Sequence, residues 1–383
     1  MSNHEVPELP TISWTEAAEE HTARWRSEAN NPPPPRVCRA DDTLSADEAY
    51  RRASEGTAFL WRGDFQNARQ LLHAMARRID RVTARSFNNA GAAAASDLFN
   101  RDRMAKSRRA RTLGMILLPF DADYTVPLRR APDVRQACRE AYGPGGEAFV
   151  ASMRELLGVI GAHEWRKTGI IVGAIEGRIH PHYGVFAPIR DDYVQLVAHA
   201  LLPSLALAFD IGTGTGVLAA VLARRGVKRI IATDDDPRAL ACARENVERL
   251  DMLDRVEVMS CDLFPPGRAP LVLCNPPWIP ARPSSPVERA IFDPGSGMLR
   301  GFLGGLPAHL SPGGEGWLIL SDIAELLGLR TRTDLMAMID AAGLVVVGRE
   351  DVRPGHPKTL DTADPLHAAR AAEVTSLWRL AAR

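Results

Sequence analysis

The sequence has no excess of charge of either sign, no closely spaced cysteine pair and no long apolar run. Its 47 lysines and arginines balance 47 aspartates and glutamates, so the net charge does not indicate a nucleic-acid partner. The five cysteines include no Cys-x-x-Cys, which favours reduced, mostly buried thiols over a disulfide frame or a zinc site. No apolar run approaches membrane-spanning length, and the first residues lack the basic and apolar segments of an export signal. We therefore expect a cytoplasmic protein with no membrane partner.

The 383 residues are too many for one compact core and predict two domains. Residues 1–40 are polar and end in four prolines, which predicts a flexible arm. From Ser45 the apolar spacing becomes helical, so we predict a mostly helical domain over 41–168. One long helix in it places six apolar residues on one face: Phe65, Ala68, Leu72, Met75, Ile79 and Val82.

The pattern changes over 169–190. Two β-prone runs, 170–172 and 183–186, are separated by glycines and a proline and predict a hairpin linker to a second domain over 191–383. His180 and His182 lie in this linker, but no nearby Cys or third His completes a ligand set, so we expect structural histidines and no metal.

Small residues over 88–96 predict a loop, and a basic cluster follows it. The cluster could contact RNA or an acidic protein, but a solvated helix face is favoured because no aromatic residues interleave and the chain is neutral. Its members are Arg101, Arg103, Lys106, Arg108, Arg109 and Arg111.

The most informative stretch is Phe209-Asp210-Ile211-Gly212-Thr213-Gly214-Thr215-Gly216. Apolar residues precede and follow it, which predicts a strand, a tight turn and a helix. Three alternate glycines let the backbone turn sharply and let a ligand approach the main chain. A second β-branched run ends in Asp234, at the interval at which an acid accepts hydrogen bonds from ribose hydroxyls. The loop therefore predicts a nucleotide-like ligand.

The charge of the loop narrows the choice of ligand. A carboxylate at its mouth, Asp210, would repel a pyrophosphate, and no Lys-Ser or Lys-Thr pair follows the glycines. A ligand that carries positive charge is favoured, such as the sulfonium of S-adenosylmethionine. The alternative is an ordinary dehydrogenase-type glycine turn.

A short apolar strand, 271–274, runs directly into Asn275-Pro276-Pro277-Trp278. With the glycine loop, Asp234 and Asp262-Leu263-Phe264, this motif resembles the class I S-adenosylmethionine-dependent methyltransferases over about 170–348. Within them it is similar to the enzymes that modify a glutamine of release factors or ribosomal proteins. The resemblance implies an α/β fold, a seven-stranded Rossmann-like sheet with helices on both faces and an antiparallel last strand. It also implies an N-terminal domain that helps to recognise the substrate. The sequence departs from that family at Pro188-Ile189-Arg190-Asp191, where Pro-Arg-Pro-Glu is expected.

The Asn-Pro-Pro-Trp motif suits methyl transfer to nitrogen. The lone pair of a planar amide or aryl amine is delocalised and must be aimed at the sulfonium methyl. N–H groups that donate to the Asn275 side-chain oxygen and the Pro276 carbonyl would hold the nitrogen and stabilise its developing positive charge. Trp278 would offer a flat face to the substrate. The motif includes no general base, and none is needed if the proton leaves after transfer.

We therefore predict an S-adenosylmethionine-dependent methyltransferase that acts on a protein glutamine amide. Alternatives with the same chemistry are an RNA base amine and a small-molecule amine or heterocycle of secondary metabolism; a non-catalytic nucleotide-binding partner module is the alternative of another class. The expected methyl-acceptor residues are Asn275, Pro276, Pro277 and Trp278. The expected cofactor residues are Asp210, Gly212, Thr213, Gly214, Thr215, Gly216, Asp234, Asp262, Leu263 and Asn275.

Overall fold

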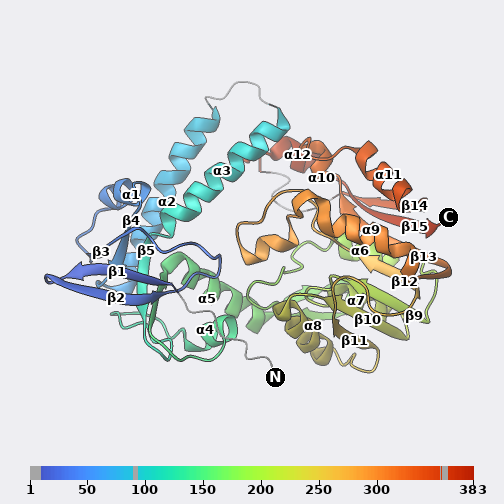
Figure 1. Ribbon diagram of the computed structural model, residues 1–383, viewed down its shortest axis with the longest axis horizontal. Coiled ribbons are helices and arrows are strands. Elements are labelled where there is room, and N and C mark those ends of the chain that lie inside the picture. The colour runs from blue at the N-terminus through green and yellow to red at the C-terminus, as the bar shows by residue number, and fades with distance from the viewer. Residues whose placement is uncertain (1–9, 89–93, 354, 356–360) are drawn as a thin grey trace. The chain divides into compact units, whose positions relative to one another are not determined.

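The structure is a computed structural model that describes residues 10–88, 94–353, 355 and 361–383 (Figure 1). It divides into two compact units. Of the described residues, the first unit contains 10–88 and 100–164, and the second contains 94–99 and those from 165 onward. No helix in the described ranges is long and apolar enough to cross a membrane.

The first unit contains a six-stranded mixed sheet in the order β1-β2-β6-β5-β4-β3. Its strands are β1 (Thr11–Glu16), β2 (Glu19–Trp25), β3 (Arg36–Ala40), β4 (Thr57–Trp61), β5 (Ile116–Phe120) and β6 (Phe149–Ser152). The helices that accompany it are α1 (Ala46–Ser54), α2 (Phe65–Asn88), α3 (Ala95–Leu113), α4 (Arg135–Tyr142) and α5 (Met153–Thr168), of which the first turn of α3 and the last turn of α5 belong to the second unit.

This sheet corrects two predictions. The flexible arm over 1–40 is wrong for the described residues 10–40, because Ile12 and Trp14 alternate into the core and β1 pairs with β2 along its whole length. The mostly helical domain over 41–168 is also wrong, because β4, β5 and β6 interrupt it. A short, fully buried strand such as Thr57–Trp61 has no polar face, so its periodicity does not separate it from a piece of buried helix.

The predicted long helix is present as α2. Five of its six expected core residues are buried, but Val82 remains 49% exposed. The predicted loop over 88–96 lies mostly outside the described residues, and α3 begins at Ala95.

The linker forms a hairpin of β7 (Ile170–Val172) and β8 (Gly177–Ile179). The second strand predicted at 183–186 is wrong, because a short 3-10 turn, η1 (Gly173–Ile175), closes the hairpin earlier. Glu176 takes the left-handed conformation that ends this turn.

The second unit contains a seven-stranded sheet in the order β11-β10-β9-β12-β13-β15-β14. The strands are β9 (Leu207–Ile211), β10 (Arg229–Asp234), β11 (Val256–Ser260), β12 (Ala269–Cys274), β13 (Leu310–Ser321), β14 (Leu344–Val352) and β15 (Thr375–Ala382). The sheet is parallel from β11 to β13, and β15 is antiparallel to both of its neighbours, as predicted for the last strand.

Helices cover both faces of this sheet. They are α6 (Asp192–His199), α7 (Val217–Arg224), α8 (Pro237–Arg249), α9 (Gly297–His309) and α11 (Arg332–Ala341). Two short helices, α10 (Ile323–Leu326) and α12 (His367–Ala372), pack in a separate small apolar cluster. One core joins the buried faces of α6, α7 and α8 to the sheet, and a second joins those of α9 and α11 to it. Successive strand residues such as Ala208 and Phe209 point into different cores, as the period of a strand requires.

Candidate active site

The glycine loop connects β9 to α7, as predicted. Gly212, Gly214 and Gly216 all have positive φ, at 70°, 57° and 81°. Gly216 caps α7 in the left-handed conformation, and a Cβ atom there would lie 3.3 Å from the Cα atom of Ala243. Backbone conformation and close helix packing both require glycine at this position.

Asp210 lies beneath the loop rather than at its mouth, which corrects the predicted placement of this carboxylate. Its side chain is 1% exposed, and Oδ2 accepts hydrogen bonds from Thr213 Oγ1 at 2.6 Å and from the Ala219 backbone N–H at 3.1 Å. Ala219 is the third residue of α7, so Asp210 ties the loop to the start of that helix. Burial raises the pKa of Asp210 to about 6, although these two hydrogen bonds oppose the shift.

Asp234 ends β10 beside the loop. Its Oδ2 accepts a hydrogen bond from the Gly214 N–H at 2.9 Å, and its Oδ1 accepts one from the Asp236 N–H at 3.0 Å. Burial also raises the pKa of Asp234. Neither Asp234 nor Asp210 forms an ion pair with an arginine, lysine or histidine of the described residues. The two carboxylates therefore leave negative charge at the loop without a cation to balance it.

Asp262 and Leu263 follow the end of the neighbouring strand, β11. Asp262 is exposed, while Leu263 has a positive φ of 62° and its carbonyl accepts a hydrogen bond from Thr233 Oγ1 at 2.5 Å. This bond fixes the Asp262-Leu263 turn to the end of β10. The carboxylate of Asp262 is thus available at the same edge of the sheet as Asp234.

Asn275 lies on the other side of the glycine loop. Cys274 of β12 pairs with Ile211 of β9, so Asn275 and Gly212 leave the sheet side by side. The Asn275 Oδ1 atom accepts a hydrogen bond from Trp278 Nε1 at 2.9 Å, which orients the side-chain amide. That oxygen keeps a second lone pair. No described residue donates a hydrogen bond to the Pro276 carbonyl.

Trp278 is half-buried and has structural partners, in addition to the flat face that it is predicted to offer to the substrate. Besides its bond to Asn275, its ring packs against the edges of three apolar clusters. The Arg190 guanidinium carbon lies 5.3 Å from the ring centroid, which is a cation–π distance. The tryptophan therefore fixes the shape of the motif.

Arg190 is a residue of the site that the sequence did not indicate. Its guanidinium pairs with Asp192 at 3.1 Å and with Glu373 at 3.1 Å, and both carboxylates are buried. Ser321 donates a further hydrogen bond to Glu373 at 2.8 Å. The position at which the chain departs from the Pro-Arg-Pro-Glu pattern is thus the position that contacts the motif tryptophan. That departure was the only feature of the sequence that could have drawn attention to Arg190.

Asn246 of α8 is a second residue that sequence reasoning missed. It is buried, its Nδ2 donates to the Thr215 carbonyl at 3.0 Å and to the His180 carbonyl at 3.3 Å, and its Oδ1 accepts from the His180 N–H at 2.7 Å. One amide therefore ties the glycine loop to the segment after the hairpin. The helical periodicity of α8 indicates which face of the helix is buried, but it does not indicate which backbone groups a buried amide contacts.

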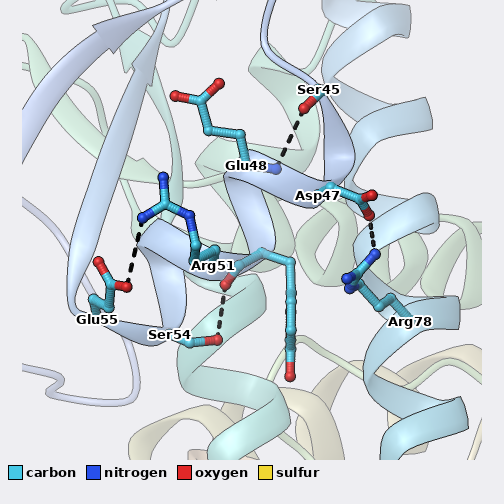
Figure 2. A pocket seen from close by; sticks show the side chains of 8 residues that line it. Ser45, Asp47, Glu48, Arg51, Ser54, Glu55 and Arg78 are labelled. Atoms are coloured by element: carbon cyan, nitrogen blue, oxygen red, sulfur yellow. Dashed lines mark hydrogen bonds and ion pairs between the residues drawn. The ribbon is translucent and has the colours of Figure 1, made fainter.

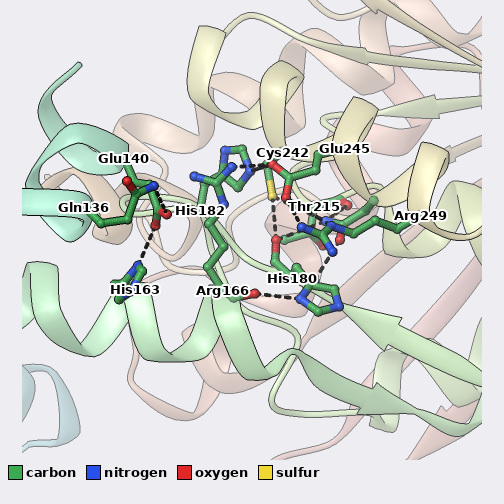
Figure 3. Close-up of polar contacts among 11 residues, drawn as sticks. Gln136, Glu140, His163, Arg166, His180, His182, Thr215, Cys242, Glu245 and Arg249 are labelled. Carbon is green, nitrogen blue, oxygen red and sulfur yellow. Dashed lines mark hydrogen bonds and ion pairs between the residues drawn. The ribbon is translucent and has the colours of Figure 1, made fainter. Parts of the chain in front are cut away.

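The two linker histidines have separate structural partners (Figure 3). His180 Nδ1 lies 2.6 Å from the Arg166 carbonyl, and His182 Nε2 lies 2.8 Å from Glu245 Oε2. Arg166 and Arg249 also pair with Glu245. Burial opposes ionisation of Glu245, but these bonds outweigh it and hold its pKa at about 2. Among the described residues, no three His, Cys, Asp or Glu side chains form a group that could hold a metal ion.

The segment after the motif closes on itself and leads to α9. Ile279 bridges to Phe292, and the Asp293 carboxylate accepts hydrogen bonds from the Met298 and Leu299 N–H groups at 3.0 and 3.1 Å. A Cβ atom on Gly212 would lie 2.5 Å from Met298 Cε. The start of α9 therefore lies against the glycine loop, so residues after the motif also border the site.

Comparison with known proteins supports a methyltransferase domain in the second unit. Residues 176–322 match the family model described as the methyltransferase small domain. This segment holds the glycine loop, both strand-end acids and the Asn-Pro-Pro-Trp motif, and it confirms the resemblance drawn from the sequence.

Individual relatives are similar over part of the chain. The release factor glutamine methyltransferase of Cereibacter sphaeroides is 36% identical over 195 residues, which are 47% of this chain and 65% of that protein. A putative protein N5-glutamine methyltransferase of Methanocaldococcus jannaschii is 26% identical over 162 residues, 40% of this chain and 80% of that protein. The tRNA1(Val) (adenine(37)-N6)-methyltransferase of Vibrio parahaemolyticus is 38% identical over 95 residues, 24% of this chain and 40% of that protein. The chain thus spans less than two thirds of the release factor methyltransferase.

Proposed function

We propose that this protein transfers a methyl group from S-adenosylmethionine to a planar nitrogen, and that the nitrogen is a glutamine side-chain amide of a protein. The observation that carries the proposal is the placement of Asn275 beside Gly212, with its amide oriented by Trp278 and with the Pro276 carbonyl free of donors among the described residues. Two hydrogen-bond acceptors therefore lie at the edge of the sheet next to the loop for the cofactor.

The unbalanced acids at the loop fit this cofactor. S-adenosylmethionine brings an electrophilic methyl group on a sulfonium and a positively charged ammonium. Asp210 and Asp234 lack cationic partners among the described residues, so a positively charged ligand would lower the pKa of both carboxyl groups towards its usual range. We assign Asp234 to the ribose hydroxyls and Asp262 to the adenine amino group.

Residues of the motif then orient the acceptor. Two N–H groups of the substrate amide would donate to Asn275 Oδ1 and to the Pro276 carbonyl. These bonds turn the nitrogen lone pair towards the methyl group and stabilise the positive charge that develops on nitrogen. The proton leaves after transfer, so the site requires no general base. Arg190 and its buried carboxylates hold Trp278, which in turn holds Asn275.

The glutamine acceptor is supported by the two relatives whose names specify glutamine methylation. An exocyclic amine of an RNA base is a second candidate, since a tRNA adenine N6-methyltransferase is similar over 95 residues, 24% of this chain. Both acceptors present N–H groups on a planar nitrogen, so the motif alone accepts either.

The five free cysteines, three of them buried, support the expected cytoplasmic location.

Methyl-labelled S-adenosylmethionine distinguishes the acceptors. The purified protein is incubated with a cell extract and the label is followed into protein, RNA and small-molecule fractions. We expect label in protein, at glutamine by mass spectrometry of peptides. Nuclease-sensitive label would favour the RNA base instead, and the absence of label from every fraction would contradict methyl transfer.

A further inference from the structure

The first unit has a hollow between α1, α2 and α3 that the methyl-transfer site does not use. Its volume is about 210 Å³, and its apolar lining includes Ile79, Val82, Phe87 and Met104. Val82 is 49% exposed and Met104 is 67% exposed. Two large aliphatic side chains on neighbouring helices therefore face water at one groove, which is typical of an interaction surface.

Two of the three helices that form this groove, α2 and α3, are strongly basic, although the whole chain is neutral. α2 carries five arginines and one aspartate, and α3 carries five arginines, one lysine and two aspartates. Arg101 and Arg108 line the groove itself, one turn before and one turn after Met104. The exposed apolar side chain is thus flanked by guanidinium groups on the same helix face.

Unlike Lys106 and Arg109 of the same helix, the two arginines of the groove have no acidic partner among the described residues. Lys106 pairs with Asp102 and Arg109 pairs with Asp80, so their charges are balanced within the unit. Arg108 is exposed and makes no hydrogen bond or ion pair with a described residue. Arg101 is held by the Ser86 carbonyl at 3.2 Å and by the Phe87 ring at 5.3 Å, which position its guanidinium without neutralising it.

A second hollow on α1 provides a contrast (Figure 2). It is lined by Asp47, Glu48 and Glu55 as well as by Arg51 and Arg78. Asp47 pairs with Arg78, and Glu55 pairs with Arg51 at 3.7 Å. Because its charges are paired, that surface has no preference for an anionic partner.

We propose that the groove of α1, α2 and α3 docks an acidic amphipathic segment of a partner protein. Apolar side chains of the segment pack on Val82 and Met104, while its carboxylates pair with Arg101 and Arg108. RNA fits this surface less well, because stacking needs open aromatic faces. The aromatic rings of the groove, Phe87 and Tyr50, are half-buried and lie beneath Arg101 and Arg78.

Fluorescence anisotropy on the full chain tests the proposal with three labelled probes. The first is a 16-residue peptide (about four helical turns) with leucines at helical spacing and glutamates between them, the second is a scrambled peptide of the same composition, and the third is a single-stranded RNA of 16 nucleotides. We expect the amphipathic peptide to bind at least about tenfold more tightly than the scrambled one. Its affinity should fall as salt rises.

Exposed substitutions locate the peptide on the groove. We expect Met104→Glu and Arg108→Glu each to weaken peptide binding about tenfold. Arg154→Glu, at an exposed arginine of α5 outside the groove, should change it less than about twofold and serves as the matched control. Met104→Gln removes the apolar contact without adding charge and should weaken binding in the same direction.

Equal affinity for the amphipathic and scrambled peptides would overturn the proposal. The proposal would also be overturned if the RNA bound more tightly than the amphipathic peptide and Met104→Glu left the affinity for RNA unchanged. That result would define a phosphate-binding surface instead. Because these readouts use no methyl donor, they are independent of the proposed methyl transfer.

Discussion

At the scale of single residues, the buried carboxyl group of Asp210 determines the charge beneath the glycine loop. It accepts hydrogen bonds from Thr213 and from the start of α7, so it shapes the loop whether or not it is ionised. Burial raises its pKa to about 6 from a usual value of 3.8. Its charge therefore changes within a pH range in which the protein can be studied.

This shift predicts a pH-dependent affinity for S-adenosylmethionine. The ionised carboxylate attracts the positively charged ligand, so affinity should be highest above pH 6 and should fall as pH decreases through about 6 and the carboxylate is protonated. Between pH 7 and pH 5 we expect a loss of roughly tenfold in affinity by calorimetry. Asp210→Asn keeps the acceptor oxygen and removes the charge, so much of this dependence should disappear. An equally steep profile in the variant would contradict the assignment.

At the scale of secondary-structure elements, the glycine loop is held from two sides. Asp210 joins it to α7, and Asn246 joins Thr215 to α8 and to the segment at His180. The loop is thus shaped by helices on its own side of the sheet before any ligand binds. This pre-organisation lowers the ordering cost of binding.

Removal of the Asn246 amide tests this arrangement. Asn246→Ala leaves the buried Thr215 carbonyl and the His180 N–H without their partner, so we expect a loss of about 1–3 kcal/mol in the free energy of unfolding. Cofactor affinity should weaken by roughly tenfold. The matched control is Glu248→Ala, at an exposed position of the same helix, and it should leave both quantities nearly unchanged. Unchanged affinity in Asn246→Ala would show that the loop keeps its shape without this tie.

The secondary-structure elements differ in how well the sequence predicted them. Three strands of the second sheet were predicted from runs that end at a polar or glycine-rich turn: 205–209, the β-branched run before Asp234, and 271–274. The complete seven-stranded sheet was expected from the family resemblance. Most strands of the first unit were missed, because they are short and alternate with helices whose periodicity dominates the pattern. Arg190 and Asn246 could not be predicted as site residues. Their partners lie 183 and 66 residues away in the sequence, and only folding brings them together.

At the scale of the whole molecule, basic residues are distributed unevenly along the chain. The chain is neutral, yet α2 and α3 in the first unit concentrate basic residues that acids elsewhere balance. The first unit also contains Glu155 of α5, which accepts hydrogen bonds from the Glu28 N–H at 3.1 Å and from Tyr142 Oη at 3.0 Å. Burial raises the pKa of Glu155 to about 7, although these bonds oppose the shift.

From the raised pKa of Glu155 we predict how the stability of the first unit depends on pH. The pKa of Glu155 in the folded state lies above the usual 4.5. Its carboxyl group therefore contributes fully to the stability of the folded state below pH 4.5, and this contribution is lost as pH rises through about 7. We expect Glu155→Gln to be more stable than the parent protein by about 2 kcal/mol at pH 8, after allowance for partial solvent screening, and similar to it at pH 4.5. Hydrogen exchange of the β6 amides at the two pH values measures this difference. A variant that is less stable at pH 8 would contradict it.

The most direct test of the proposed function compares binding and turnover in Asn275→Ala. If Asn275 orients the acceptor nitrogen, the variant should lose about 100- to 1000-fold in the rate of methyl transfer to protein while its affinity for S-adenosylmethionine changes less than about threefold. Asp234→Ala should show the opposite pattern, with weakened cofactor binding. Methyl transfer by Asn275→Ala at the parental rate, or failure of the parent protein to bind S-adenosylmethionine in calorimetry, would contradict the proposed function.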